Sequence, residues 1–437
     1  MTTADQWLET APTHWSRGRL KNLILTATNG TWGSDPVEDE ADVHCVRAAD
    51  FDRVSQRVTL TNAPLRHVEP SSLRQHLLEA GDLVLEKSGG GDKQPVGMAV
   101  LFTGSGKAVC SNFCARIKPS TQVDHRFLTY VFAAAYGQGL TQAAIKQTTG
   151  IQNLDTGAFF ASRWAYPALE EQRRIADFLD SETRHVDAVA RTREAQLRCL
   201  QQLWRSRLAT TAHELIEAHG LVPLRRVVSS VEQGWSPQCE DVEAVPHEWS
   251  VLKTSAVSSG IFLPLEHKRL PSDLAPDLRY KIADGDILMT RGSGSPAHVG
   301  VAALAETQDR NLLLSDLLYR VKVGYGWSPR FVTLMLSSQP IRGYMSLLFR
   351  GQSGQTIKLR AEDIKSITVP AAPIHTQDAI AEELEAERHK IDASCTALNR
   401  SQLLLTERRQ ALITAAVTGQ FDVSTASGRN VTEGVTV

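Results

Sequence analysis

The sequence predicts a mixed α/β (α+β) protein with two similar globular domains and two long antiparallel coiled-coil helices, related by a pseudo-twofold internal repeat. Three observations predict this fold. The chain repeats its landmarks at an offset of about 204 residues. Each copy opens with short apolar runs broken by Gly, Pro, Asn and Asp, which is typical of strands and turns. Each copy closes with more than 40 residues free of Pro and Gly, which favours a long helix.

The internal repeat is clearest in two Gly-Asp segments. GDLVL at 81–85 and GDILM at 285–289 are 204 residues apart. One such match is weak, because Gly-Asp before apolar residues is a common turn signal. Six matches in the same order indicate a duplication. The other pairs are Leu20 and Leu224, Phe127 and Phe331, Gly150 and Gly354, Gln172 and Gln377, and Asp187 and Asp392.

The repeat sets the expected domain boundaries. We expect globular domains at 1–168 and 221–374, helices at 169–220 and 375–420, and a disordered tail at 421–437, where small polar residues dominate. Pro167 and Pro373 precede the helices, and Gly220 and Gly419 end them. Inside the globular domains, 124–144 and 328–349 have apolar faces and are expected to be helices.

Each long helix carries one apolar seam. The spacing is three, four or seven residues in the first helix and strictly seven in the second, which predicts a partner helix. At 1.5 Å per residue each rod would span roughly 60–70 Å, longer than a domain of this size is wide. The two rods therefore most simply pair with each other. The predicted seam residues are Leu179, Val186, Leu197, Leu200, Trp204, Leu384, Ile391, Leu398, Leu405 and Leu412.

Composition excludes several classes of protein. No apolar run reaches the roughly 18 residues of a membrane helix, and the polar N-terminus does not resemble a secretory signal, so we expect a cytoplasmic protein. The net charge is −2, so any nucleic-acid surface must be a local one. Six scattered cysteines lack zinc-site spacing and are interpreted as reduced structural thiols.

Catalytic motifs are absent from the sequence. There is no Asn/Asp-Pro-Pro-aromatic segment to hold a flipped base, no phosphate-binding Gly-x4-Gly-Lys-Ser/Thr loop and no His-Glu-x-x-His motif. The glycines and lysine at 88–93 do not have the spacing of a phosphate loop. We therefore expect a binding protein with no catalytic residue, metal or cofactor of its own.

Several segments together resemble the specificity subunits of Type I restriction–modification enzymes. They are PTHW at 12–15, GQTIK at 354–358, and the segments at 166–175 and 409–419, which resemble the start and end of the family's helices. The resemblance covers about 12–423. The second helix departs from the pattern, because 373–377 lacks the expected Glu, and the second domain lacks an early Trp.

The resemblance implies a non-catalytic DNA-binding subunit. It implies two target-recognition domains, each reading one half of a split double-stranded DNA target, with the helices setting the gap. It also implies two methyltransferase (M) subunits and restriction (R) subunits as partners. S-adenosylmethionine, ATP and Mg would then be bound by those partners.

Candidate DNA contacts lie in three places of each half. Glycine-rich loops at 86–94 and 290–296 can approach DNA closely, and loops at 146–153 and 350–358 carry the amide and guanidinium groups that pair with base edges. Basic residues near each domain's start suit phosphates. The alternative is that these are ordinary turns facing water. The candidates are Arg19, Lys21, Lys87, Lys93, Lys146, Gln147, Gln152, Asn153, Arg225, Arg226, Arg291, Arg350, Gln352, Gln355 and Lys358.

Other interpretations stay open from sequence. Residues 173–207 carry eight Arg against five Asp or Glu, which fits a phosphate-facing stripe or a solvated or partner-facing surface, and we favour the latter. The chain could serve a related methylation system with a fused methyltransferase–nuclease. It could also be a coiled-coil interaction protein without a DNA role. A last alternative is an enzyme, which would require methyl transfer or DNA cleavage by the purified chain alone.

Overall fold

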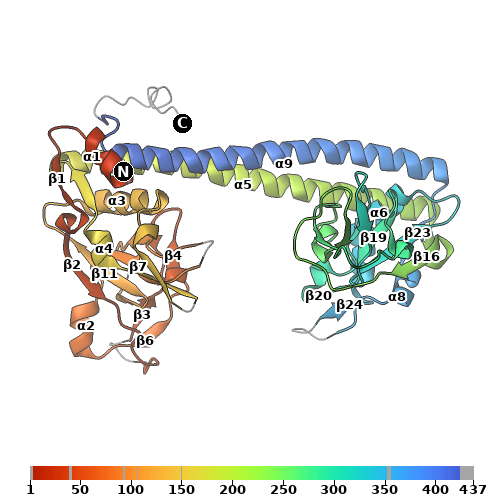
Figure 1. Ribbon diagram of the computed structural model, residues 1–437, viewed down its shortest axis with the longest axis horizontal. Helices are drawn as coiled ribbons and strands as arrows, with labels where there is room; N and C mark the ends of the chain where they lie inside the picture. Colours follow the sequence, from red (N-terminus) through yellow and green to blue (C-terminus); the bar gives the residue numbers. More distant parts are fainter. Residues whose placement is uncertain are drawn as a thin grey trace. The chain divides into compact units, whose positions relative to one another are not determined.

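The computed structural model describes residues 3–38, 42–91, 94–104, 106–148, 150–351 and 356–423. The chain divides into two compact units (Figure 1). Unit 1 contains residues 1–194 and 399–437, and unit 2 contains residues 195–398. Each unit has one globular part and a stretch of both long helices, α5 (Leu169–His219) and α9 (Ile374–Val417). The predicted mixed α/β fold with two globular parts and two long helices is confirmed.

Unit 1 is built on a six-stranded sheet of order β2-β11-β7-β9-β5-β4. Helix α3 (His125–Gly137) packs on this sheet and buries most of its residues. The central strand β7 is buried at all four positions, as expected for a strand covered on both faces. The strands are β2 (Ile24–Asn29), β4 (Phe51–Asp52), β5 (Arg57–Val58), β7 (Leu83–Glu86), β9 (Ala99–Leu101) and β11 (Cys114–Pro119).

Three smaller sheets complete unit 1, in the orders β10-β3-β6, β12-β13-β8 and β1-β14. Short helices precede or connect these strands along the chain. The strands are β1 (Ser16–Arg19), β3 (Asp42–Val46), β6 (Leu65–His67), β8 (Ser88–Gly89), β10 (Ala108–Cys110), β12 (Ile145–Thr148), β13 (Ile151–Leu154) and β14 (Arg163–Tyr166). The helices are α1 (Thr3–Thr10), η1 (Leu20–Leu23), η2 (Ala48–Asp50), α2 (Pro70–His76), η3 (Gln142–Ala144) and α4 (Thr156–Phe160).

Unit 2 repeats this plan with a four-stranded main sheet of order β16-β23-β19-β21. The smaller sheets have the orders β18-β17-β22, β20-β24 and β15-β25. The strands are β15 (Leu221–Pro223), β16 (Val228–Gln233), β17 (Trp249–Leu252), β18 (His267–Arg269), β19 (Ile287–Thr290), β20 (Gly292–Ser293), β21 (Ala302–Leu304), β22 (Asn311–Leu313), β23 (Leu318–Val323), β24 (Ile357–Lys358) and β25 (Thr368–Pro370). The helices are η4 (Leu224–Arg226), η5 (Thr254–Ala256), η6 (Leu278–Tyr280), η7 (Pro296–His298), α6 (Pro329–Ser337), α7 (Gln339–Ser346) and α8 (Ala361–Ser366).

The duplication extends to the register of the strands. Val84 pairs with Arg116 between β7 and β11, and Leu288 pairs with Arg320 between β19 and β23. Both partners are thus displaced by 204 residues. The neighbouring pairs β2–β11 and β16–β23 also share a register shift at the same place. The sequence repeat is therefore a repeat of backbone geometry.

A buried glutamine locks the start of each long helix. The Asp124 amide donates to Gln172 Oε1 at 3.0 Å, and Gln172 Nε2 donates to the Pro167 carbonyl at 2.9 Å. The Ser328 amide and Gln377 make the matching contacts in unit 2, at 2.9 Å and, to the Ala372 carbonyl, 2.7 Å. Each glutamine satisfies backbone groups that burial would otherwise leave unpaired.

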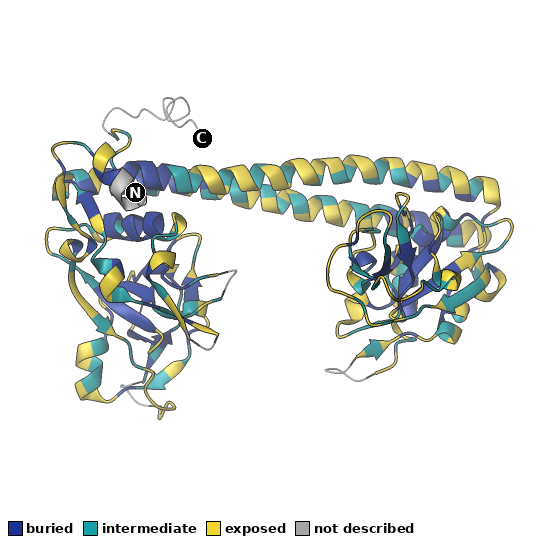
Figure 2. Ribbon diagram, viewed as in Figure 1, coloured by how far each residue is buried: buried dark blue, intermediate teal, exposed yellow. Residues whose placement is uncertain are grey.

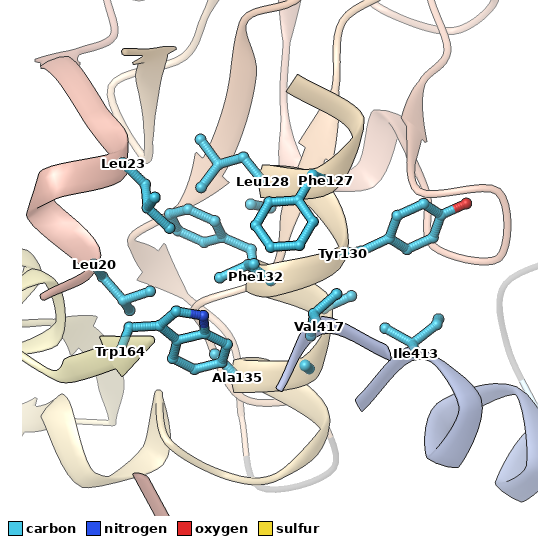
Figure 3. Packing of buried hydrophobic residues seen from close by; sticks show 14 of the residues in the cluster. Leu20, Leu23, Phe127, Leu128, Tyr130, Phe132, Ala135, Trp164, Ile413 and Val417 are labelled. Carbon is cyan, nitrogen blue, oxygen red and sulfur yellow. The ribbon is translucent and has the colours of Figure 1, made fainter. Parts of the chain in front are cut away.

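Each unit has an apolar core that includes both long helices. In unit 1, Ile413 and Val417 of α9 pack with α3 and Trp164 (Figure 3), and Leu179 of α5 belongs to the same cluster. In unit 2, Leu215 of α5 and Leu384 of α9 share one cluster. In unit 1, Phe178 contacts Phe421 and Asp187 pairs with Arg409. In unit 2, Trp204 contacts Arg388 and Arg207 pairs with Glu383. The two helices therefore run antiparallel within each unit.

The burial of the predicted seam residues varies along the helices (Figure 2). Leu179, Val186, Leu384 and Leu412 are buried beside the globular parts. The remaining positions are half-buried, which is typical of a two-helix seam with solvent on both sides. These positions are Leu197, Leu200, Trp204, Ile391, Leu398 and Leu405.

Two expected helices are shorter than predicted. The helix expected at 124–144 ends at Gly137, and Gly139 adopts a left-handed φ of 74°, which terminates helices. The helix expected at 328–349 breaks into α6 and α7 around Ser338, because Pro340 at the start of α7 cannot continue a preceding helix. At the C-terminus, Phe421 stacks edge-on against Phe178 at 5.4 Å, so packed chain continues into the expected tail, while 424–437 lie outside the described residues.

Candidate nucleic-acid interface

The glycine-rich loop of unit 1 is joined to the predicted amide-bearing loop by a small sheet. The Leu154 amide donates to the Lys87 carbonyl at 2.8 Å. Ser88 Oγ donates to Asn153 Oδ1 at 2.7 Å, and Asn153 lies opposite Lys146 in the β12–β13 pairing. The fold therefore places Lys87, Lys146 and Asn153 together, although 59 residues separate Lys87 from Lys146 in sequence.

Gln152 points the other way. Its side chain is only 7% exposed, and its Oε1 accepts a hydrogen bond from the Val96 amide at 3.3 Å. Alternate side chains of a strand face opposite sides, so Asn153 is partly exposed while Gln152 is inside. Gln152 thus holds the chain just after the glycine-rich loop from the buried side, through its hydrogen bond with Val96. The expectation that it is a loop residue open to DNA does not hold in this structure.

Lys146 and Gln147 are exposed on β12. Lys146 Nζ lies 2.7 Å from Asp155 Oδ2. The hydrogen bond from Lys146 lowers the pKa of that carboxyl, so Lys146 carries an exposed, screened ion pair. Such a pair contributes little to stability, and Lys146 can exchange it for a phosphate.

The corresponding place in unit 2 gathers three basic residues. Gly292 of β20 pairs with Lys358 of β24, and the Arg350 amide donates to the Lys358 carbonyl at 2.9 Å. Arg291 precedes β20, and its Nη1 donates to the Asp316 carbonyl at 3.4 Å. Arg350 and Lys358 are exposed and Arg291 is half-buried. Lys93, Gln352 and Gln355 lie outside the described residues.

The basic residues near each domain's start lie in a different sheet from these loops. Arg19 ends β1 and faces Arg163 of β14, and both are exposed. Like charges directly opposite each other destabilise a strand pair, which is tolerable where water or an anion screens them. Lys21 is exposed on η1, and Arg225 and Arg226 are exposed on η4.

A hairpin that sequence reasoning missed borders the glycine-rich loop. Its strands are β4 and β5, and its turn residue Arg53 donates from Nη2 to Glu86 Oε2 at 3.0 Å. Burial raises the pKa of Glu86, and Arg53 opposes that shift. An open cleft of about 820 Å³ is lined by Phe51, Arg53, Glu86, Gly90, Gly91 and Gln94, among others. Residues 51–58 show no regular alternation of polar and apolar side chains, so the sequence carried no clear signal for this hairpin.

Other sites that could carry chemistry are not apparent in the described chain. Within the described ranges, no group of three His, Cys, Asp or Glu is placed to hold a metal ion. None of the helices there is long and apolar enough to cross a membrane. Burial raises the pKa of Cys45 to about 11 and that of Cys114 to about 12, so these thiols stay protonated at neutral pH.

Comparison with known proteins connects these loops to a family. Residues 77–198, which span the glycine-rich loop, the amide-bearing loop and the first part of α5, match the family model of the Type I restriction modification DNA specificity domain. The chain is 24% identical over 326 residues to the Type I restriction enzyme EcoKI specificity subunit of Escherichia coli strain K12, covering 71% of this chain and 68% of that protein. The chain therefore contains a Type I specificity domain at 77–198 and is similar over most of its length to a Type I specificity subunit.

A second relative matches the chain more closely over a shorter stretch. The chain is 30% identical over 162 residues to the Type I restriction enzyme EcoEI specificity subunit of Escherichia coli. That match covers 36% of this chain and 27% of the relative, so it spans about a quarter of the relative's length.

A solved structure shares the fold of this chain. It was described in work on complex assembly and conformational transition of the type I R-M system, and it superposes with a TM-score of 0.66 at 16% identity. The superposition covers 94% of this chain and 99% of that one.

Proposed function

We propose that this chain reads a bipartite DNA target, one half-site with each globular domain, and directs methyltransferase and restriction subunits to it. The observation that carries the proposal is that one scaffold occurs twice with different side chains at equivalent loop positions. Lys87 corresponds to Arg291, and Lys146 corresponds to Arg350, both at an offset of 204. Two readers with a common backbone and different loop chemistry suit two different half-sites.

The proposed readout divides the loop residues by their chemistry. Asn153 and Gln147 offer amides suited to adenine, and Arg291 and Arg350 offer the forked donors suited to guanine. Lys87, Lys146 and Lys358 suit phosphates, which fix the position of the duplex without reading its sequence. Arg19, Lys21, Arg225 and Arg226 serve the same positioning role, and Lys93, Gln352 and Gln355 remain candidates on the loops.

The chain itself is proposed to catalyse nothing and to bind no cofactor. Methyl transfer from S-adenosylmethionine, and ATP- and Mg-dependent translocation and cleavage, belong to the partner subunits, in the cytoplasm. The absence of catalytic motifs from the sequence supports this division of labour. Purified chain that alone methylated or cut DNA would contradict it.

The two domains are proposed to be exchangeable modules. Replacing 1–168 with the matching part of another specificity subunit should change one half-site only, and replacing 221–374 should change the other. Lengthening helices 169–220 and 375–420 together should change the accepted gap and leave both half-sites unchanged. A chimera that altered both half-sites at once would refute the modular arrangement.

The decisive experiment is a genome-wide map of methylated adenines with and without this gene. The expected result is a two-part motif with a fixed gap that vanishes on deletion and returns with the gene. An unchanged map, together with DNA binding that is absent or independent of salt when the methyltransferase is present, would favour a coiled-coil interaction protein instead.

A further inference from the structure

A pocket of about 310 Å³ in unit 1 lies where the β4–β5 hairpin meets helices α3, α5 and α9. Its lining is dominated by arginine. Arg57 comes from the hairpin, Arg126 from α3, Arg184 and Arg191 from α5, and Arg409 from α9. Cations gathered around one small cavity repel each other, so the arrangement needs either acidic partners or an anionic ligand.

Only part of this charge is balanced inside the pocket. Arg126 Nη1 lies 3.0 Å from Asp180 Oδ2, and Arg409 Nε lies 3.1 Å from Asp187 Oδ1. Those two aspartates are the acidic residues of the lining. Arg126 also pairs with Asp124 and Asp177 just outside the lining. The charges of Arg126 and Arg409 are therefore balanced by carboxylates, whereas those of the other three arginines are not.

The three remaining arginines form no ion pair with any part of the chain that the structure describes. Arg57, Arg184 and Arg191 are exposed. Arg184 and Arg191 are seven residues apart on α5, so two helical turns place them on one face. At the offset of 205 that relates Gln172 to Gln377, the second copy has His389 and Thr396 in their places. The arginines therefore belong to one copy of the repeat.

The amide of Gln56 lies in the same lining. The residue is only 5% exposed, but its amide is not among the fully buried polar groups that lack a partner in the described chain, so the amide reaches the open space of the pocket. Its backbone is held by the Leu101 amide, which donates to the Gln56 carbonyl at 2.9 Å, in a left-handed conformation with φ of 57°. An amide that faces the pocket can donate a hydrogen bond to a ligand there, and strained non-glycine residues concentrate at functional sites. Both features fit a polar ligand.

We propose that this pocket binds a phosphate group of the DNA backbone. Arg57, Arg184 and Arg191 supply the charge, and the Gln56 amide donates a hydrogen bond to a phosphate oxygen. Guanidinium groups match phosphate geometry with paired donors. The site therefore holds the duplex without reading its sequence.

The choice of DNA rests on the proposed function and on the continuity of the hairpin. Arg53, in the turn of the hairpin, lines the cleft beside the glycine-rich loop, and Arg57, four residues on, lines the pocket. Gln56 and Arg409 also line a groove of about 710 Å³ that Arg53 borders. A DNA strand that crosses the glycine-rich loop would thus meet basic residues along the β4–β5 hairpin as far as α5.

The test measures how DNA affinity depends on salt. The full chain is assembled with its methyltransferase subunits, and duplex carrying the mapped motif is titrated at several salt concentrations. Each lost phosphate contact lowers the slope of log K against log salt by about 0.9. The R184Q/R191Q variant should therefore lose about 1 to 2 units of slope and bind on the order of tenfold more weakly at low salt. Its methylated motif should be unchanged.

Two variants control for general charge and for structure. R173Q/R174Q removes the same charge from the same helix outside the pocket and should keep the wild-type slope. R184K/R191K keeps the charge and should retain most of the slope. Equal slopes for R184Q/R191Q and R173Q/R174Q would overturn the proposal, as would weaker methyltransferase association with unchanged DNA binding, which would indicate a protein partner.

A titration with inorganic tripolyphosphate separates DNA from a free polyphosphate. Saturable binding that R184Q/R191Q abolishes, with an unchanged DNA slope, would reassign the pocket to a small anion and overturn the DNA assignment. A wild-type complex without any bipartite motif would instead refute the proposed function. In that case, absence of tripolyphosphate binding would also refute the anion site.

Discussion

The two globular parts have the same interior and different edges. The main sheet of unit 2, β16-β23-β19-β21, reproduces β2-β11-β7-β9 of unit 1, whereas unit 1 continues into β5 and β4. At the inner end of the loop, unit 1 has the buried Glu86 and unit 2 has the buried Thr290, whose Oγ1 donates to the His298 carbonyl at 2.6 Å. The packed strands are thus the same in the two units, while the side chains at the sheet edges and in the loops differ between them.

The strongest way to break this comparison is to substitute the paired glycines Gly30 and Gly234. A Cβ at either would lie 2.1 to 2.2 Å from a backbone carbonyl oxygen, of Cys110 or Leu314 respectively. Neither neighbour is a flexible side chain, so Gly30→Ala and Gly234→Ala should each destabilise their own unit by more than about 4 kcal/mol. Hydrogen exchange of the two units would measure this, and a stable G234A variant would show that the interiors differ.

The buried ion pairs sharpen the comparison. Arg116 Nε lies 2.6 Å from Asp82 Oδ2, but Arg320 lies 3.7 Å from Asp286 and also bonds Glu232. Removing one partner of a tight buried pair costs about 3 kcal/mol or more, so Asp82→Ala should destabilise unit 1 by that amount. Asp286→Ala should cost about half as much, because Arg320 keeps its hydrogen bond to Glu232 at 2.9 Å. Arg116 keeps only Glu79, which is more exposed and lies 3.3 Å away. Denaturant unfolding monitored in each unit tests the order, and the reverse order would contradict it.

The buried glutamines at the starts of the two long helices, Gln172 and Gln377, should contribute equally to the stability of their units. Gln172→Ala and Gln377→Ala each leave a buried amide and a carbonyl without a partner, which costs about 2 kcal/mol. Gln→Glu at the same positions keeps the acceptor for the amide and loses the donor for the carbonyl. Thermal unfolding of the four variants is the measurement. A clear effect of one alanine variant and none of the other would mean that only one of the two glutamines stabilises the start of its helix.

The smallest effect concerns pH and the Glu86 carboxyl. Burial raises the pKa of Glu86 above its ordinary value of 4.5, so the folded state holds its proton more tightly than the unfolded state. The resulting stability is complete below pH 4.5 and is lost as pH rises through the folded pKa. Wild-type unit 1 should therefore lose stability relative to Glu86→Gln over that interval. Thr290 does not titrate there, so Thr290→Val should give a pH-independent difference in unit 2.

Sequence reasoning predicted the repeated parts well, because a repeat leaves the same apolar spacing twice. The long helices, the Gly-Asp strands and the family resemblance all came from such patterns. The inward turn of Gln152 could not be predicted, since it depends on which face of β13 meets Val96. The hairpin with Arg53 was missed because its two-residue strands are too short to show alternation. The break at Ser338 was visible in Pro340, which the apolar spacing at 328–349 masked.

The partition of α9 between the units has a consequence for synthesis. Unit 2 is one continuous stretch, 195–398, whereas unit 1 is closed by residues after 398, including Leu412, Ile413 and Val417 in its core. During synthesis from the N-terminus, all residues of unit 2 are therefore made before the residues that complete the core of unit 1. The domain translated first is the one that finishes folding last, and until then its exposed apolar side is the part most in need of a chaperone.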